Sequence, residues 1–243
     1  MIQKRSLGQN FLRSGKAISD IVKAGDIHPG ETVLEAGPGE GVLTEALLKA
    51  GAKVIAIEKD RRLIPILTQK FATEISTDQL TLIEADILDF DIFGIPLNPK
   101  LSTLNPSYKV IANIPYYITG AFIRKFLEAE QQPSRMVILV QKEVAERIIA
   151  RDDRESILSI SVKAYGSPKI IGIVKAGSFV PAPKVDSAIL AIENISKSFF
   201  DGFTEKSFFE ILKAGFSHKR KIISGNLKPI FGDHTDEILV ECG

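Results

Sequence analysis

The sequence predicts an α/β fold, in which helices cover both faces of a mainly parallel sheet, followed by a small helical region. Three observations predict it. Short apolar segments alternate with helical patterns through most of the 243 residues. A glycine-rich turn joins the first apolar segment to a helical pattern. After residue 194 the strand signals stop, so we expect one domain at 1–194 and a second, helical domain at 195–243.

Strands are expected where four to eight residues are dominated by aliphatic and β-branched side chains. The first ends in the glycine-rich turn, and the next two end in acidic residues. The last two are joined through a proline-rich segment, 179–183. In chain order the expected strands are Thr32–Ala36, Lys53–Glu58, Leu80–Glu84, Tyr108–Ala112, Arg135–Gln141, 170–174 and 187–192.

Helices are expected where apolar residues recur every three or four positions. Gly51 ends the first of them, and Asp60 is a capping residue type at the start of the second. The prolines of 91–107 predict a long surface loop instead. The expected helices are 42–50, 60–74, 118–130, 142–150, 155–165, 204–214 and 217–228.

Composition excludes several classes of protein. Hydrophobic residues make up 44% and charged residues 25%, as in ordinary globular domains. No apolar run exceeds five residues, so we expect no membrane-spanning helix. The N-terminus lacks the apolar core of a secretory signal. The single cysteine, Cys242, fits a reducing compartment, and three scattered histidines predict no metal site.

The charges are sorted along the chain although the net charge is only +1. Residues 1–19 and 211–232 contain basic residues and no acidic ones, whereas 71–99 contains six acidic residues and no lysine or arginine. The two basic segments could line a surface for nucleic acid. Charge alone does not decide this, because such runs are usually solvated helix faces.

The glycine-rich turn at 35–41 has the pattern acid-x-G-x-G-x-G rather than the dinucleotide pattern G-x-G-x-x-G. Glu35 and Glu40 would repel a pyrophosphate, but they suit a cationic ligand. S-adenosylmethionine carries a sulfonium and an ammonium group and no phosphate. Gly37 and Gly39 would let the backbone approach its methionyl end.

Acidic residues also end the second and third strands. Glu58 is placed to accept both ribose hydroxyls, Asp86 to accept from the adenine amino group, and Ile87 to pack on the adenine ring. Each feature alone could be a tight turn or a solvated acid. Three consecutive strands that end this way predict an S-adenosylmethionine site.

The fourth strand runs into Asn113, Ile114, Pro115 and Tyr116. An adenine amino group is a poor nucleophile because its lone pair is delocalised. The Asn113 carbonyl and a backbone carbonyl fixed by Pro115 could accept its N–H bonds, while Tyr116 stacks on a flipped base. The alternative is a proline-containing strand exit with a core tyrosine.

With these motifs in place, the sequence resembles the ribosomal RNA adenine N6-dimethyltransferases. The match covers nearly the whole chain in the right order. The residues that carry it are 8–12, 35–41, 57–58, 85–86, 113–116, 141–147, 179–183, 185–187 and 216–221.

The resemblance implies a Rossmann-like S-adenosylmethionine-dependent methyltransferase sheet with a small C-terminal helical domain. It implies dimethylation of two adjacent adenines in the 3′-terminal hairpin of 16S rRNA within the immature 30S subunit, by a cytoplasmic monomer without metal or membrane contact. It implies that the cofactor is contacted by Asn10, Leu12, Gly37, Glu58, Asp86 and Asn113. The target base would be held by Asn113, Tyr116 and Phe179. RNA phosphates would be bound by Lys4, Arg5, Lys219, Arg220 and Lys221.

The sequence departs from the family in three places. The loop at 91–107 is longer, His218 and Lys219 replace the more usual Gln and Arg, and Gly243 ends the sequence before the usual helical tail. Two interpretations follow: the sequence is a fragment, or its C-terminal domain is trimmed.

Three alternatives remain at this point. An Erm-type enzyme would methylate one adenine of 23S rRNA, but the segments 141–148 and 179–189 favour the small-subunit branch. A non-catalytic assembly factor would not need the intact Glu58, Asp86, Asn113 and Tyr116. A methyltransferase for DNA or a small molecule would not need the basic ends.

Overall fold

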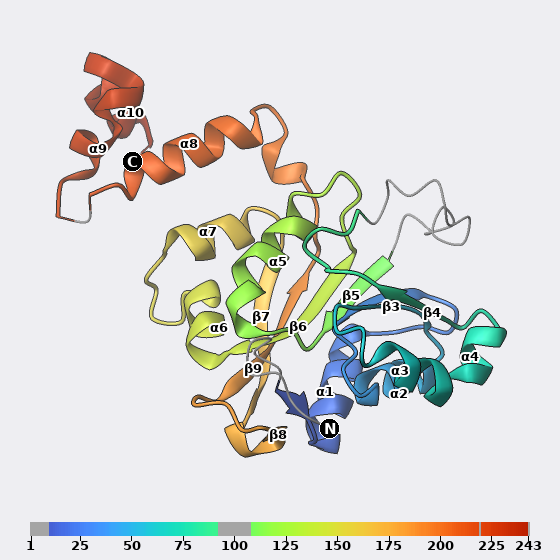
Figure 1. Ribbon diagram of the computed structural model, residues 1–243. Coiled ribbons are helices and arrows are strands. Elements are labelled where there is room, and N and C mark those ends of the chain that lie inside the picture. The colour runs from blue at the N-terminus through green and yellow to red at the C-terminus, as the bar shows by residue number, and fades with distance from the viewer. Residues whose placement is uncertain (1–9, 92–107, 219, 243) are drawn as a thin grey trace.

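The computed structural model describes residues 10–91, 108–218 and 220–242, and its main body is a seven-stranded sheet (Figure 1). The strand order is β4-β3-β2-β5-β6-β9-β7. Strands β4 to β6 pair in parallel, and β9 is antiparallel to both of its neighbours. The mainly parallel sheet expected from the sequence is therefore confirmed. The strands are β2 (Thr32–Ala36), β3 (Lys53–Glu58), β4 (Leu80–Glu84), β5 (Tyr108–Ala112), β6 (Arg135–Gln141), β7 (Ser167–Val174) and β9 (Ser187–Glu193).

Helices cover both faces of this sheet because its central strands are apolar on both sides. In β2, Val33 packs with the helices of one face and its neighbour Leu34 with those of the other, and both side chains are fully buried. This double burial is typical of parallel sheets. The first face carries α1 (Gly15–Gly25), α2 (Val42–Lys49) and α3 (Ile64–Lys70), and the second carries α5 (Thr119–Leu127), α6 (Lys142–Ile149) and α7 (Ile157–Lys163).

Some elements differ from the sequence expectation. The single helix expected at 60–74 is wrong, because the chain breaks at Phe71 into α3 and α4 (Ala72–Ser76). Helix α1 was not expected. Neither was the small antiparallel pair of β1 (Phe11–Leu12) and β8 (Phe179–Val180). Except for Asp91, the loop expected at 91–107 lies outside the described residues.

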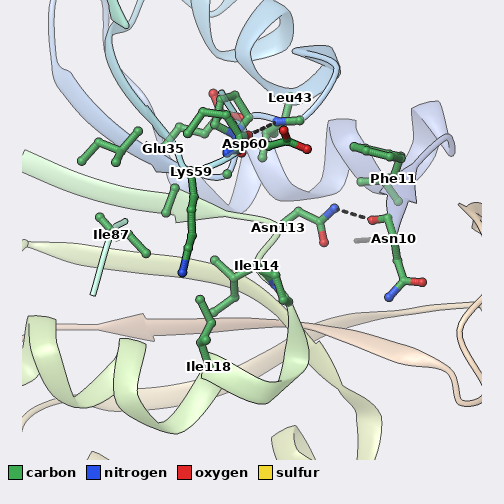
Figure 2. Close-up of a pocket in the computed structure, with 18 of the residues that line it drawn as sticks. Asn10, Phe11, Glu35, Leu43, Lys59, Asp60, Ile87, Asn113, Ile114 and Ile118 are labelled. Carbon is green, nitrogen blue, oxygen red and sulfur yellow. Dashed lines mark hydrogen bonds between the residues drawn. The ribbon is translucent and has the colours of Figure 1, made fainter. Parts of the chain in front are cut away.

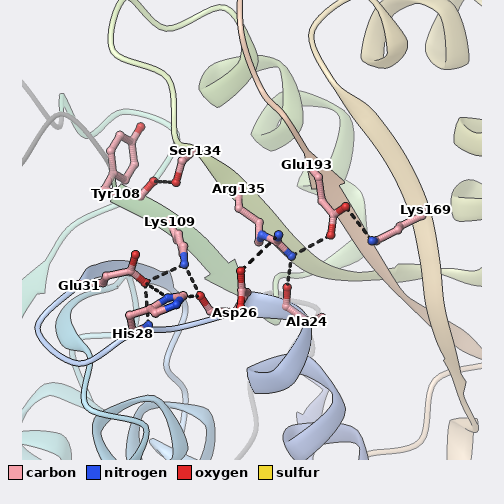
Figure 3. Close-up of polar contacts among 10 residues, drawn as sticks. All are labelled: Ala24, Asp26, His28, Glu31, Tyr108, Lys109, Ser134, Arg135, Lys169 and Glu193. Carbon is pink, nitrogen blue, oxygen red and sulfur yellow. Dashed lines mark hydrogen bonds and ion pairs between the residues drawn. The ribbon is translucent and has the colours of Figure 1, made fainter.

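Polar contacts at the amino ends of the parallel strands hold the C-terminal end of α1 (Figure 3). Lys109 of β5 donates to the Asp26 carbonyl, and Arg135 of β6 donates to the Ala24 carbonyl at 2.8 Å. Arg135 also pairs with Glu193 at 2.7 Å. Cations at a helix C-terminus satisfy its free carbonyls. These contacts fix the C-terminal end of α1, whose N-terminal end follows β1.

Beyond β9, the described residues form only helices: the 3₁₀ turn Ser198–Phe200, α8 (Glu205–Gly215), α9 (Ile223–Phe231) with the 3₁₀ turn after it, and α10 (Thr235–Cys242). They project from one end of the sheet (Figure 1). The ring of Phe200 lies 5.0 Å from that of Tyr165, which follows α7, and 5.6 Å from that of Phe208 in α8. This aromatic cluster joins the C-terminal helices to the sheet.

Candidate cofactor and methyl-acceptor site

A pocket of about 230 Å³ opens at the carboxyl ends of the parallel strands (Figure 2). It lies where the chain, after building β3 and β4 on one side of β2, crosses to β5 on the other. Ligands of open α/β sheets bind at such switch points. Ten of the residues predicted for the site line this pocket: Asn10, Leu12, Gly37, Gly39, Glu58, Asp86, Ile87, Asn113, Pro115 and Tyr116.

The glycine-rich turn needs glycine for its backbone shape. Gly37, Gly39 and Gly41 have φ angles of +68°, +60° and +76°, a region that other residues enter at a cost. A Cβ at Gly39 would lie 3.0 Å from the ring of Phe11, and one at Gly41 would lie 2.5 Å from the ring of Phe71. The turn therefore packs too closely on both sides for a side chain.

Glu58 ties this turn to the end of β3. One carboxylate oxygen accepts from the Gly39 N–H at 3.0 Å, and the other accepts from the Asp60 N–H at 2.8 Å. Burial raises the pKa of Glu58, the backbone N–H groups of Asp60, Gly39 and Lys59 oppose this shift, and the nearby Asp60 carboxylate adds to it. A carboxylate has about four lone-pair sites, so acceptor capacity remains for a ligand in the pocket.

Asp86 is held in its ionised form. Its two oxygens accept from the Lys59 ammonium and, at 3.0 Å, from the Leu88 N–H. Partial burial acts against ionisation, but these donors outweigh it and lower the pKa of Asp86. Sequence reasoning missed Lys59, because a lysine just after a strand resembles a solvated residue. Its position next to Glu58, at the end of a strand that lines the site, was the available signal.

The electrostatic argument from Glu35 and Glu40 is corrected by the structure. Burial raises the pKa of Glu35 to about 8, so its carboxyl group is largely protonated at neutral pH. Its Oε2 has no hydrogen-bond partner among the described residues. Glu40 is paired with Arg13 at 2.6 Å. Neither residue therefore offers the unpaired negative charge expected from the sequence.

Asn113 leaves the end of β5 with its side-chain amide in a defined orientation. Its Nδ2 donates to the Asn10 carbonyl at 3.2 Å, which leaves its Oδ1 as an acceptor on the pocket side (Figure 2). Pro115 and Tyr116 follow, and the Tyr116 hydroxyl lies 2.6 Å from the Ser187 hydroxyl. A side-chain carbonyl, a proline-fixed backbone and an aromatic face thus meet at one end of the pocket.

The segment before α1 closes the pocket on the side of the glycine turn. Arg13 reaches Glu40, and its N–H donates to the Ser178 carbonyl at 2.7 Å. Phe11 lies against Gly39. Sequence reasoning predicted Asn10 and Leu12 for the site but missed Phe11, because a two-residue strand gives no periodic signal.

Phe179 does not reach the pocket. It pairs with Leu12 across β1 and β8, is only 2% exposed, and packs in the core of the face that carries α1. Its expected stacking on a base opposite Tyr116 is therefore not formed in this conformation. Besides Tyr116, the aromatic residues that line the pocket are Phe11 and Tyr117, of which Tyr117 is 68% exposed.

The predicted RNA-binding residues are only partly covered by the structure. Arg220 and Lys221 are exposed in the turn between α8 and α9. Lys4, Arg5 and Lys219 lie outside the described residues. Among the residues that the structure does describe, no group of three His, Cys, Asp or Glu side chains could hold a metal ion, and no helix could cross a membrane.

Comparisons with known proteins agree with this geometry. A family model described as ribosomal RNA adenine dimethylase matches residues 2–241. The chain is 42% identical over 220 residues to a Ribosomal RNA small subunit methyltransferase A of Dehalococcoides mccartyi, covering 90% of this chain and 72% of that protein. It is 40% identical over 239 residues to the protein of that name from Streptococcus pneumoniae, covering 97% and 80%.

Two solved structures share the fold over nearly the whole chain. The 23S rRNA methyltransferase ErmE is 27% identical with a TM-score of 0.76, covering 96% of this chain and 89% of that one. A dimethyladenosine transferase from Plasmodium falciparum is 29% identical with a TM-score of 0.74, covering 95% and 78%.

The Rossmann-like sheet and its strand-end pocket define an enzyme of the S-adenosylmethionine-dependent methyltransferase class. Within that class, the chain belongs to the ribosomal RNA adenine dimethylase family.

Proposed function

We propose that this protein dimethylates the N6 amino groups of two adjacent adenines in the 3′-terminal hairpin of 16S rRNA, within the immature 30S subunit. The observation that carries the proposal is the oriented amide of Asn113 at the edge of the pocket. The relatives named as small-subunit methyltransferases, at 37–42% identity, support the choice of the small subunit.

The pocket residues fit S-adenosylmethionine, which supplies a methyl group activated by its sulfonium. Glu58 accepts from the ribose hydroxyls with the lone pairs that Gly39 and Asp60 leave free. Asp86, kept ionised, accepts from the adenine amino group, and the buried Ile87 packs against the adenine ring. Asn10, Leu12, Gly37 and Asn113, which also line the pocket, make the other contacts with the cofactor.

Asn113 acts on the target adenine. Its Oδ1 accepts one N–H of the amino group, and the backbone carbonyl next to Pro115 accepts the other. This concentrates the nitrogen lone pair towards the methyl group. S-adenosylmethionine, when bound, would supply the methyl group to this nitrogen, and the methylated amino group would lose its proton to water. Catalysis therefore comes from positioning and electrostatics.

Tyr116 supplies the aromatic face for the extruded base. Arg220 and Lys221 contact RNA phosphates, as do Lys4, Arg5 and Lys219. We place the division between the methyltransferase domain and the helical RNA-binding domain after residue 194, one residue beyond the end of β9. The protein works as a monomer in the cytoplasm, in a late step of small-subunit assembly.

The likeness to the 23S rRNA methyltransferase structure makes that specificity the second candidate. Primer extension separates the two in a strain that lacks its own adenine dimethyltransferases, because dimethyladenine stops reverse transcriptase. We expect this gene to restore a stop near the 3′ end of 16S rRNA and none in 23S rRNA. A stop restored only in 23S rRNA would refute the proposal. The Asn113→Ala variant, expressed at the same level, is the matched control.

A further inference from the structure

We propose that Ser187 is a positioning residue that holds the ring of Tyr116 in place to receive the target base. The inference rests on the proposed function, because it concerns the acceptor end of the same pocket. Tyr116 and Ser187 are 71 residues apart in the sequence, and their hydroxyl oxygens lie 2.6 Å apart.

The topology brings Ser187 to this place. Strands β5 and β6 are parallel and end at the pocket, whereas β9 is antiparallel to β6 and therefore begins on that side. Ser187 is the first residue of β9. It pairs with Gln141 at the end of β6 on one side and with Val174 at the end of β7 on the other. Its backbone is therefore held by two neighbouring strands.

The contact is well suited to positioning. Ser187 is fully buried, so water cannot replace its partner without a change in packing. Tyr116 begins the short 3₁₀ turn that follows Pro115, so its backbone anchors one end of the side chain. The hydroxyl contact anchors the other end. A ring held at both ends cannot swing away from the base that it stacks on, while its face still lines the pocket.

Burial raises the pKa of Tyr116, and the hydrogen bond to Ser187 partly opposes this rise. The phenol therefore stays neutral at physiological pH, as a stacking and hydrogen-bonding role requires. Tyr117, the next residue, is 68% exposed and does not share this anchor. Of the two adjacent tyrosines, Tyr116 is the one whose hydroxyl is held by Ser187.

A double-mutant cycle tests this role. Ser187→Ala removes the anchor and leaves the ring, and Tyr116→Phe removes the hydroxyl and leaves the ring. We expect each variant to lower kcat roughly 3- to 10-fold, the range for one lost hydrogen bond. The affinity for S-adenosylmethionine should stay unchanged. The double variant should be no slower than either single variant, because both remove the same interaction.

Ser159→Ala is the matched control, because Ser159 is also fully buried but belongs to the capping box of α7. It should lower stability and leave kcat unchanged. The inference is overturned if Ser187→Ala transfers methyl groups at the wild-type rate, if the effects of the two single variants add, or if cofactor affinity falls in parallel with kcat. Methyl transfer by the wild-type protein tests the proposed function separately.

A spectroscopic measurement tests the contact without activity. With ¹³C-labelled tyrosine, the Tyr116 signal is the one missing in Tyr116→Phe. We expect Ser187→Ala to shift that signal and to leave those of Tyr108, Tyr117 and Tyr165 in place. An unmoved Tyr116 signal would overturn the inference.

Discussion

Replacing Gly39 with alanine should weaken cofactor binding through two effects, backbone strain at Gly39 and contact of the new Cβ with Phe11. Gly39 has a φ angle of +60°, where a residue with a Cβ is strained by about 1–2 kcal/mol. The new Cβ would also lie 3.0 Å from two ring carbons of Phe11, so that ring must move. Phe11 lines the pocket, and its displacement disturbs the segment that carries Asn10.

The size of the effect follows from these values. Without cofactor, the turn of the Gly39→Ala variant can relax to a less strained backbone shape. Cofactor binding must then restore the strained shape, so the strain energy is subtracted from the binding free energy. One to two kcal/mol corresponds to roughly a 5- to 30-fold weaker Kd. Isothermal titration with S-adenosylmethionine measures the affinity, and urea unfolding of the free protein measures any strain that remains in the turn.

Two other glycines serve as controls. Gly30 has a φ angle of +85° in the turn before β2, at the amino ends of the parallel strands, and a Cβ there would meet no described atom within 4 Å. Gly30→Ala should lower stability by about 1 kcal/mol and leave affinity unchanged. Gly120, exposed in the first turn of α5, has neither strain nor contact, so Gly120→Ala should be neutral or stabilising. A folded Gly39→Ala protein with wild-type affinity would refute the reasoning.

Three further predictions concern acidic and amide side chains of the pocket. Asn113→Ala should keep the affinity for S-adenosylmethionine within about tenfold and lower turnover about a hundredfold or more; equal losses, measured by titration and single-turnover transfer, would contradict its role. Glu58→Ala should mainly weaken cofactor binding, because the turn loses its acceptor for the Gly39 N–H, and unchanged affinity would remove it from the ribose site. For Glu35, a pKa raised from 4.5 to about 8 means that the folded protein keeps a proton that the unfolded chain releases. Wild-type stability should therefore fall relative to Glu35→Gln as pH rises from about 5 to 8; parallel urea-unfolding stabilities across this range would contradict the assignment.

Features of the site that depend on local patterns could be predicted from the sequence. The spacing of Gly37 and Gly39 after a strand predicted a turn whose backbone comes close to a ligand, and both residues line the pocket. The ends of consecutive strands placed Glu58 and Asp86 at one edge of the sheet. Parallel strands bring such residues together whatever the details of packing, so the order of the elements is enough to predict their proximity.

Contacts made by irregular or two-residue segments could not be predicted in this way. The pairing of β1 with β8 joins residues about 170 positions apart and gives no periodic signal. It turns Phe179 into the core rather than towards the pocket. The break at Phe71 likewise falls where the ring packs beside Gly41, which is distant in the sequence. For α1 a signal was present but was not used, since Ser14 caps a helix in which Ala17, Ile18 and Ile21 are buried.

The measurement that tests the account most directly is methyl transfer to defined ribosomal particles. Purified protein and tritiated S-adenosylmethionine are incubated with immature 30S particles that lack adenine dimethylation, and with 50S particles and naked 16S rRNA in parallel. We expect label only in the immature 30S particles, recovered as N6,N6-dimethyladenosine. Label in the 50S particles, or no label in any substrate while the cofactor still binds, would contradict it.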